Sequence, residues 1–495
     1  MEGMLWSCLG TRRFWLAAGF IAVLGFSSFV LFYKLGAEPL QDYDEATYAE
    51  VTAESLAHGN YLSLTFQNQP YFRKPPLLFW LSTAASHVAT SPEVAVRLPS
   101  ALAALLTIFV VFFVCMEAGM ALPLAAPFAL LGAGILATIP DFSEFARDAR
   151  FDILVSLFVT LAFYFGIKTT KNSKWWLLVG VALGLAFLSK NVIAAFGAVS
   201  LIAFLVFDYS FTRSITLLRN PYLWGGVGVF FLVVAPWHIV ETLRYGSQFW
   251  HSYLGTEVLE RASMNLFPNG GNPTNAEYIA HVLRFGAPWI EVFIGLLCTV
   301  PFIWKTVAPR TRSVLGASLV TVLSVIVIMG TAQTKAYGYL MPMYPFIAIS
   351  IALISTELWK RAKYVQRAGV AGALIVLIPF AAYLTLYDAL HINPYFGWEI
   401  SQAVEERDIA AVINRTQNPV IYAYDYTAFG TVMYYTHIAG TPNPYVLLFS
   451  ASSTPPEGAF ILTSTSTINL VNVLPAHKYK NLYLGRFVSL FTVTR

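Results

Sequence analysis

Long apolar stretches recur from the N-terminus to about residue 387, and they restrict the fold of this chain more than any other feature. Each has roughly 17 to 22 residues, which is the length an α-helix needs to cross the hydrocarbon core of a membrane. Hydrophobic residues make up 57% of the 495 residues and charged residues only 12%, a balance unlike that of an ordinary soluble domain. The sequence therefore predicts a polytopic α-helical membrane protein with about eleven transmembrane helices. We expect these spans near residues 14–33, 96–116, 121–140, 151–167, 175–189, 192–207, 222–240, 285–304, 314–331, 338–356 and 368–387.

The Lys and Arg residues predict how the chain is threaded. With the N-terminus in the cytoplasm, the cytoplasmic segments carry most of the basic residues, among them Arg12, Arg13 and Lys168, as the positive-inside rule requires. The two spans beside Lys190 could instead form one broken or re-entrant element, which would exchange the sides of every later loop. The favoured threading puts these segments on the outer side: 40–76, 141–152, the turn at Lys190, 241–284, 333–339 and the C-terminal tail.

The polar segment 40–76 dominates a predicted catalytic loop, residues 34–95, that follows the first span. Its spacing predicts a helix that Asp42 caps together with Glu45, which places Asp44 in the first turn. The positive end of a helix dipole favours the ionised form of a nearby carboxylate, so Asp44 suits a general base or a partner for a cation. Acidic residues at helix starts are also common as simple capping residues, and that interpretation stays open.

Cations come from four separate outer segments: Lys74, Arg150, Lys190 and Lys335. Lys190 and Lys335 lie in apolar sequence, where a lone lysine reaches to the surface or meets an anion. If all four converge on the outer face, a phosphate at the level of the lipid headgroups is the simplest shared partner. Each could instead only anchor a helix end to anionic lipid. Asp152, at the start of a span, is predicted to be a second functional acid.

Two further segments shape the predicted architecture. Residues 77–89 are too short to span a membrane, so they predict an amphipathic helix at the outer surface. After about residue 387 the chain changes character. Short β-rich pieces alternate there with Pro, Gly and Asn, near 418–429, 431–440, 459–467 and 482–494, and residues 399–414 fit a helix. We therefore predict a transmembrane domain, 1–387, and a small α/β extracytoplasmic domain, 388–495.

Several function classes lack support in the sequence. The chain contains neither a phosphate-binding P-loop nor a dinucleotide fingerprint, so ATP or a nucleotide sugar is not expected as donor. Its three cysteines have no metal-site spacing, and its net charge of +4 does not indicate nucleic-acid binding. An outer acid together with phosphate-binding cations suggests instead that a lipid-linked phosphate is the leaving group.

An ordered set of short motifs runs through the membrane part of the chain. It comprises Asp44-Glu45 with Tyr48-Ala49-Glu50, Gly59-Asn60-Tyr61, Tyr71-Phe72-Arg73-Lys74-Pro75-Pro76, Phe187-Leu188-Ser189-Lys190, Pro236-Trp237, and Lys335-Ala336-Tyr337-Gly338-Tyr339 with Pro342 and Pro345. In this set the chain resembles the aminoarabinose transferase (ArnT) branch of the protein mannosyltransferase-like glycosyltransferases, which have the GT-C fold.

The resemblance implies a bacterial inner-membrane enzyme that transfers a sugar from a polyprenyl phosphate to an extracytoplasmic acceptor such as lipid A or another envelope glycolipid. It implies Asp44 as the catalytic residue and Lys74, Arg150, Lys190 and Tyr339 at the donor phosphate or its pocket. Our further candidates are Glu45 and Asp152 for catalysis, Lys335 for the donor phosphate, and Tyr48, Tyr71, Arg73 and Tyr337 for the substrate pocket. The alternatives are a protein O-glycosyltransferase of the same fold and a lipid or solute transporter.

The sequence also departs from the ArnT pattern at two places. Arg73 stands where that branch usually has a glutamate, and Thr256-Glu257-Val258-Leu259 replaces a stretch resembling His-Glu-His-Phe. Both departures remove potential ligands from the metal site of that branch. We therefore expect no cofactor, with a divalent metal left as an open alternative.

Overall fold

The computed structural model describes residues 2–41, 44–119, 125–208, 217–265, 272–391, 397–415, 420–424, 430–437, 445–448, 457–464 and 479–493. The chain forms two compact units. The membrane unit comprises Met1–Tyr33, Phe72–Leu78 and Leu98–Leu390. The loop-tail unit comprises Lys34–Tyr71, Phe79–Arg97 and His391–Arg495. The predicted domain boundary at residue 388 stays a prediction. By their contacts, residues 34–71 and 79–97 group with the tail.

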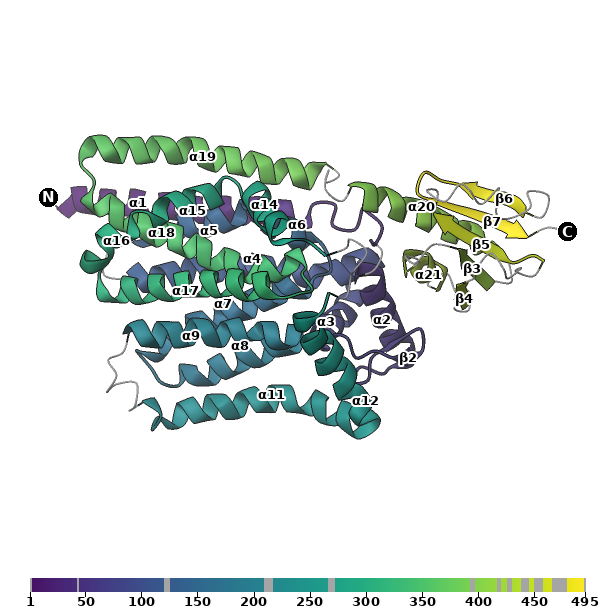
Figure 1. Ribbon diagram of the computed structural model, residues 1–495. Coiled ribbons are helices and arrows are strands. Elements are labelled where there is room, and N and C mark those ends of the chain that lie inside the picture. The colour runs from purple at the N-terminus through teal and green to yellow at the C-terminus, as the bar shows by residue number, and fades with distance from the viewer. Residues whose placement is uncertain are drawn as a thin grey trace. The chain divides into compact units, whose positions relative to one another are not determined.

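The membrane unit is built from helices (Figure 1). Its elements are α1 (Glu2–Phe32), most of α4 (Pro92–Gly119), α5 (Ala125–Ala137), α6 (Pro140–Arg147), α7 (Phe151–Thr169), α8 (Trp175–Lys190), η1 (Asn191–Ala194), α9 (Ala195–Asp208), α11 (Pro221–Tyr245), α12 (Ser247–Trp250), the π-helix η2 (His251–Glu260), α13 (Arg261–Ser263), α14 (Asn275–Phe285), α15 (Trp289–Leu297), α16 (Val300–Ile303), η3 (Trp304–Thr306), α17 (Pro309–Thr331), η4 (Tyr337–Met343), α18 (Tyr344–Arg361) and α19 (Tyr364–Leu390).

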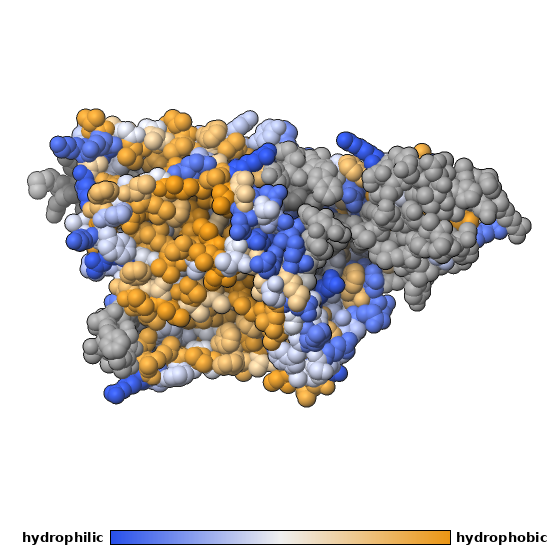
Figure 2. Space-filling view, in the orientation of Figure 1, coloured by the Kyte–Doolittle hydropathy of each residue, from blue (hydrophilic) through white to orange (hydrophobic). Residues whose placement is uncertain are grey.

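The described residues contain eight helical segments long and apolar enough to cross a membrane, or up to ten if each of two bent helix pairs counts as one span. The prediction of a polytopic helical membrane protein is confirmed. Apolar side chains cover the middle of the helices, and hydrophilic ones gather toward their ends (Figure 2). The bent pairs are α5 with α6, at 60°, and α14 with α15, at 105°.

The difference from the predicted count of about eleven arises partly at residues 175–208, which are counted once. This segment changes direction after Lys190, where Asn191 has a φ of 22°. Beyond the turn α9 folds back along α8. The two helices pack so closely that a Cβ on Gly197 would lie 2.6 Å from the Leu183 side chain. Leu201 packs likewise in one cluster with Val179. The two predicted spans in this region are thus the two arms of a hairpin.

Small residues let α8 and α11 approach closely. A Cβ on Gly180 of α8 would lie 2.0 Å from the carbonyl oxygen of Gly226 in α11, and a Cβ on Gly226 would lie 2.3 Å from the carbonyl oxygen of Trp176. Because lipid tails are as apolar as side chains, such backbone packing is a main source of helix association in membranes. The glycines therefore bring α11 against the α8 arm of the hairpin.

The loop-tail unit combines helices with two small sheets. Its elements are α2 (Asp44–His58), β1 (Thr65–Phe66), β2 (Gln69–Pro70), most of α3 (Leu77–Ser86), α20 (Gly397–Ile413), β3 (Val420–Tyr424), α21 (Gly430–His437), β4 (Tyr445–Leu448), β5 (Phe460–Ser464), β6 (Tyr479–Leu484) and β7 (Val488–Val493). The five-stranded sheet has the order β4-β3-β5-β7-β6, with β3 parallel to β4 and β5 and the other pairs antiparallel.

The helix expected at 399–414 is α20, and the expectation of a β-rich piece at 431–440 was wrong. That piece begins with α21, which runs from Gly430 to His437. The physical reason is topological: β3 and β4 are parallel neighbours, and parallel strands need a crossover connection, usually a helix. The β-branched and aromatic residues of this piece therefore belong to the helix that connects the two strands rather than to a further strand.

Candidate functional site

Asp44 and Glu45 begin α2 but lie in different environments. The Asp44 side chain is exposed, whereas Glu45 is completely buried. The backbone N–H of Gln41 donates to Glu45 Oε2 at 3.1 Å, so Glu45 does help to close the start of this helix. The capping role predicted for Asp42 lies outside the described residues.

The buried Glu45 carboxylate is paired with Arg97 of α4, also within the loop-tail unit. Arg97 Nη2 lies 2.6 Å from Glu45 Oε2, and Nε donates to Oε1 at 2.9 Å. The remaining Arg97 donors bind the backbone carbonyl oxygens of Leu35, Glu38 and Pro39 at 2.9–3.0 Å. Every charge here has partners within the fold, which is the arrangement that a buried ion pair requires.

The two tyrosines predicted for the substrate pocket from this region lie in the loop-tail unit, and their role in a pocket stays a prediction. Tyr48 and Tyr71 both contact Phe79 edge to face, with ring centroids 5.9 and 5.8 Å apart. Both side chains are buried, at 4% and 7% exposure.

In the membrane unit, Asp152, Lys190 and Tyr339 meet from three helices. Lys190 Nζ donates to Asp152 Oδ1 at 2.6 Å and lies 4.3 Å from the centre of the Tyr339 ring. Asp152 is in the first turn of α7 and Lys190 ends α8, so each charge complements the dipole of its own helix. Gly338 is required beside them, because a Cβ there would lie 2.9 Å from Asp152 Oδ2.

A second group of charges continues this arrangement. Lys74 Nζ lies 2.8 Å from Glu257 Oε2, and Arg261 Nε lies 3.2 Å from the same oxygen. Burial alone would raise the pKa of Glu257, but the charges and hydrogen bonds of Lys74 and Arg261 lower it below its ordinary value. Burial would likewise lower the pKa of Arg261, but the neighbouring Tyr339 and Glu257 raise it. Tyr339 thus joins both groups.

We call these six residues the cationic network: Lys74, Asp152, Lys190, Glu257, Arg261 and Tyr339. Its charged side chains are between 6% and 22% exposed, so each is reachable but largely desolvated. Three cations face two carboxylates, which leaves one excess positive charge among the described members. The π-helix η2 carries Glu257, and such helices occur frequently at functional sites.

Other predicted site residues have partners outside this network. Arg150 pairs with Asp148 at 3.5 Å and lies over the Phe145 ring. Lys335 Nζ donates to the carbonyl oxygen of Ala332 at 2.6 Å.

Tyr337 stacks on His281 with centroids 4.0 Å apart, and His281 in turn bonds Asp141 at 2.9 Å. Arg73 is exposed.

Arg261 was not among the site residues predicted from the sequence, and Glu257 was given no role at the site. The signal was present: the two are four residues apart in a predicted outer segment, the spacing of an ion pair on one helical face. This spacing does not by itself indicate a functional site, because oppositely charged residues on an ordinary surface helix have the same spacing. Among the described residues, no group of three or more His, Cys, Asp or Glu side chains could hold a metal ion.

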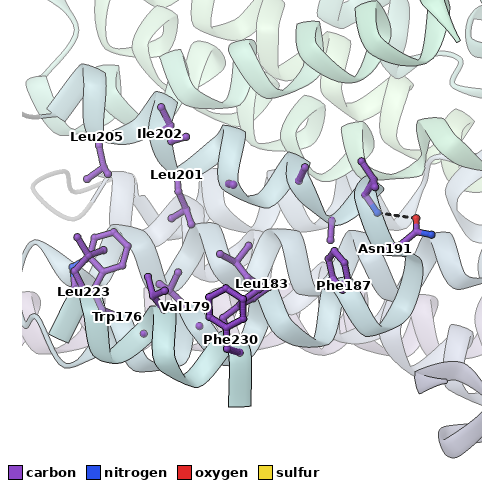
Figure 3. Close-up of a pocket in the computed structure, with 18 residues that line it drawn as sticks. Trp176, Val179, Leu183, Phe187, Asn191, Leu201, Ile202, Leu205, Leu223 and Phe230 are labelled. Atoms are coloured by element: carbon purple, nitrogen blue, oxygen red, sulfur yellow. Dashed lines mark hydrogen bonds between the residues drawn. The ribbon is translucent and has the colours of Figure 1, made fainter. Parts of the chain in front are cut away.

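A cavity of about 670 Å³ lies between the α8–α9 hairpin and α11. Its lining is almost wholly apolar, and Figure 3 shows Val179, Leu183 and Phe230 on one side with Leu201 on the other. Asn191 lies at one end, directly after Lys190 in the chain. The volume is that of a ligand pocket. An apolar chain thus has a place beside the turn that carries a cation of the network.

Comparisons with known proteins agree with the motif resemblance. Residues 73–239 match the family described as dolichyl-phosphate-mannose-protein mannosyltransferase. The chain is 23% identical over 381 residues to the undecaprenyl phosphate-alpha-4-amino-4-deoxy-L-arabinose arabinosyl transferase of Erwinia tasmaniensis, covering 73% of this chain and 66% of that one. The corresponding Aeromonas salmonicida protein is 26% identical over 357 residues, with 68% and 60% covered. The matches thus span less than two thirds of these relatives.

Solved structures show the fold. The structure of ArnT from Cupriavidus metallidurans bound to undecaprenyl phosphate superposes with a TM-score of 0.72 at 17% identity, covering 96% of this chain and 97% of that one. The Archaeoglobus fulgidus oligosaccharyltransferase AglB gives a TM-score of 0.56 at 11% identity, with 93% and 70% covered. The predicted resemblance and the predicted GT-C architecture are therefore confirmed.

Proposed function

Since this chain is an ArnT-like protein with the GT-C fold, we propose that it is a membrane glycosyltransferase that takes a sugar from a polyprenyl phosphate of the undecaprenyl type. One observation carries the proposal: the cationic network combines an excess positive charge with an apolar cavity that begins beside Lys190. A lipid with a phosphate head has an anionic group that suits the positive charge and an apolar chain that suits the cavity. The active face is proposed to be extracytoplasmic, in a bacterial inner membrane.

The reaction needs a base that takes a proton from the sugar acceptor, and positive charges that stabilise the departing phosphate. In the proposed step, the acceptor oxygen forms a bond to the anomeric carbon while the bond from that carbon to the phosphate oxygen breaks. The electron pair of the broken bond leaves on the polyprenyl phosphate. The proton of the acceptor hydroxyl passes to Asp44, the exposed carboxylate in the first turn of α2.

The network supplies the charge stabilisation. Lys74, Lys190 and Arg261 are proposed to bind the phosphate oxygens, with Tyr339 beside them. Arg261 is suited to this because its planar guanidinium binds two oxygens at once. Arg150 and Lys335 stay candidates from the sequence, but this proposal does not need them.

Glu45 is proposed to act at a distance from the chemistry. Its carboxylate is held by Arg97, so it positions the start of α2, where Asp44 lies, rather than taking a proton. Asp152 is proposed to orient the Lys190 ammonium toward the donor.

The proposed acceptor is lipid A or another envelope glycolipid, as the ArnT resemblance implies. Two alternatives are a protein acceptor on the same fold and a transporter of lipid or solute. Transporters place ionisable groups near the midplane at a repeat interface, whereas the network joins helix ends: the start of α7 and the end of α8. We therefore favour the transferase.

Mass spectrometry of envelope glycolipids tests the proposal. Cells that lack the protein should lose one fixed sugar mass from one glycolipid class, and the wild-type chain should restore it. Asp44→Asn should fail to restore it at normal expression, because loss of a general base slows transfer about 10²- to 10⁴-fold. Asp208→Asn is a matched control, since Asp208 pairs with Arg310 outside the network. Full restoration by Asp44→Asn would remove Asp44 from the mechanism.

A further inference from the structure

Glu257 places a negative charge where an anionic ligand would bind. Its Oε2 lies 2.8 Å from Lys74 Nζ and 3.2 Å from Arg261 Nε, so one carboxylate oxygen forms an ion pair with both cations. Its side chain is only 6% exposed, and the two cations keep it ionised by lowering its pKa. Any phosphate bound by Lys74 and Arg261 must share them with this carboxylate or displace it.

The charge of the proposed ligand changes during the reaction. A polyprenyl-phosphate sugar is a phosphodiester and carries one negative charge. The polyprenyl phosphate that remains is a monoester, whose second pKa is near 6, so it carries close to two negative charges at neutral pH. The single negative charge of the donor therefore balances the single excess positive charge of the network. The product carries about one negative charge more than this excess can balance.

From this mismatch we propose that Glu257 sets the charge of the network so that the site retains the monoanionic donor and releases the dianionic product. The inference rests on the proposed function, since it assumes that the network binds the lipid phosphate. Glu257 is then a specificity-determining residue: it weakens binding of the second negative charge, which appears only after transfer. Without it, Lys74 and Arg261 would hold the product more tightly.

The size of the effect follows from the geometry. The repulsion between two unit charges about 4 Å apart changes an equilibrium constant by roughly fivefold when water screens them fully, and by far more near a protein surface. The carboxylate contacts the same two cations that would bind the phosphate, so the repulsion is felt at short range. A shift of about tenfold in the preference between a monoanion and a dianion lies inside that range.

Two probes with the same hydrocarbon chain isolate this preference. Undecaprenyl phosphate is the dianion, and its methyl ester, undecaprenyl methyl phosphate, is the monoanion. Their dissociation constants are measured with the full-length protein in detergent, at pH 7.5 and fixed ionic strength. Glu257→Gln should shift the ratio of the two constants about tenfold toward the dianion. Lys74→Met, which removes a positive charge, should shift it the opposite way.

Glu117→Gln is the matched control. Glu117 also lies between two cations, 3.0 Å from Lys168 Nζ and 2.7 Å from Lys171 Nζ, but in a separate cluster. It should leave the ratio unchanged. An unchanged ratio in Glu257→Gln, or in Lys74→Met if the first variant does not fold, would overturn the inference and leave Glu257 a structural ion pair. Failure of the wild type to bind either probe would instead refute the proposed function.

Discussion

Two clusters of charge, one in each unit, differ in how completely the fold satisfies them. In the loop-tail unit, Arg97 and Glu45 are 4% and 0% exposed, and Arg97 donates both to the carboxylate and to three backbone carbonyls. In the membrane unit, Lys74, Lys190 and Arg261 are 13–22% exposed, and they outnumber their carboxylate partners.

The difference separates a structural ion pair from a binding site. A buried pair is tolerated only when hydrogen bonds replace the lost water, and breaking it leaves an uncompensated charge. A partly exposed cluster with surplus charge keeps a capacity to bind something else. We therefore expect the Arg97 cluster to govern stability and the cationic network to govern ligand binding.

The largest expected effect is on the buried pair. Arg97→Met should lower the free energy of unfolding by about 3–5 kcal/mol, because it leaves the Glu45 carboxylate buried and unpaired. Thermal unfolding in detergent measures this as a reduced Tm. Arg73→Met is the control, since Arg73 is exposed and its loss should change little. If Arg97→Met kept the wild-type Tm, the contrast between the two clusters would disappear.

The double variant Glu45→Gln with Arg97→Met sharpens the same point. Removing both charges also removes the unpaired carboxylate, so the double variant should recover part of the stability that the single variant loses. A double variant no more stable than Arg97→Met would mean that the lost contacts to backbone carbonyls, rather than the unpaired charge, set the cost.

A smaller effect is expected inside the network. Gly338→Ala puts a Cβ 2.9 Å from Asp152 Oδ2, so Asp152 must move and its 2.6 Å contact with Lys190 is disturbed. Affinity for undecaprenyl phosphate should fall roughly tenfold, because small displacements of positioning groups are costly at such sites. Gly330→Ala, where a Cβ meets nothing within 4 Å, should bind as the wild type does. Equal binding by both variants would show that the Asp152 position does not matter.

The smallest expected effect is a pH dependence of stability. The pKa of Glu257 is lower in the folded protein than its ordinary value of 4.5. Its ionised form therefore stabilises the fold above that value, and this contribution is lost as the pH falls through the lowered pKa. The Tm difference between the wild type and Glu257→Gln should thus be present at pH 7 and shrink below pH 4.5. A Tm difference that stayed the same below pH 4.5 would show that the Glu257 carboxylate does not make this contribution.

Much of the architecture could be predicted from the sequence because it depends on local properties. An apolar run long enough to cross the bilayer has to form a helix there, since the backbone has no other way to satisfy its hydrogen bonds. The helices α3 and α20 were also expected near their observed positions. The piece at 431–440 was misjudged because β-branched and aromatic residues suit a strand locally, whereas the parallel pairing of β3 and β4 requires a helix there.

The sequence by itself determined that this is a membrane protein with an acid at the start of α2 and with isolated lysines beside its spans. Only the tertiary structure decided which of those charges meet. Arg97 reaches Glu45 across 52 residues, and Lys74 reaches Glu257 across 183. Such pairs leave no periodic signal in the chain, because an ion pair is selected by where helices pack and not by the residues next to either partner.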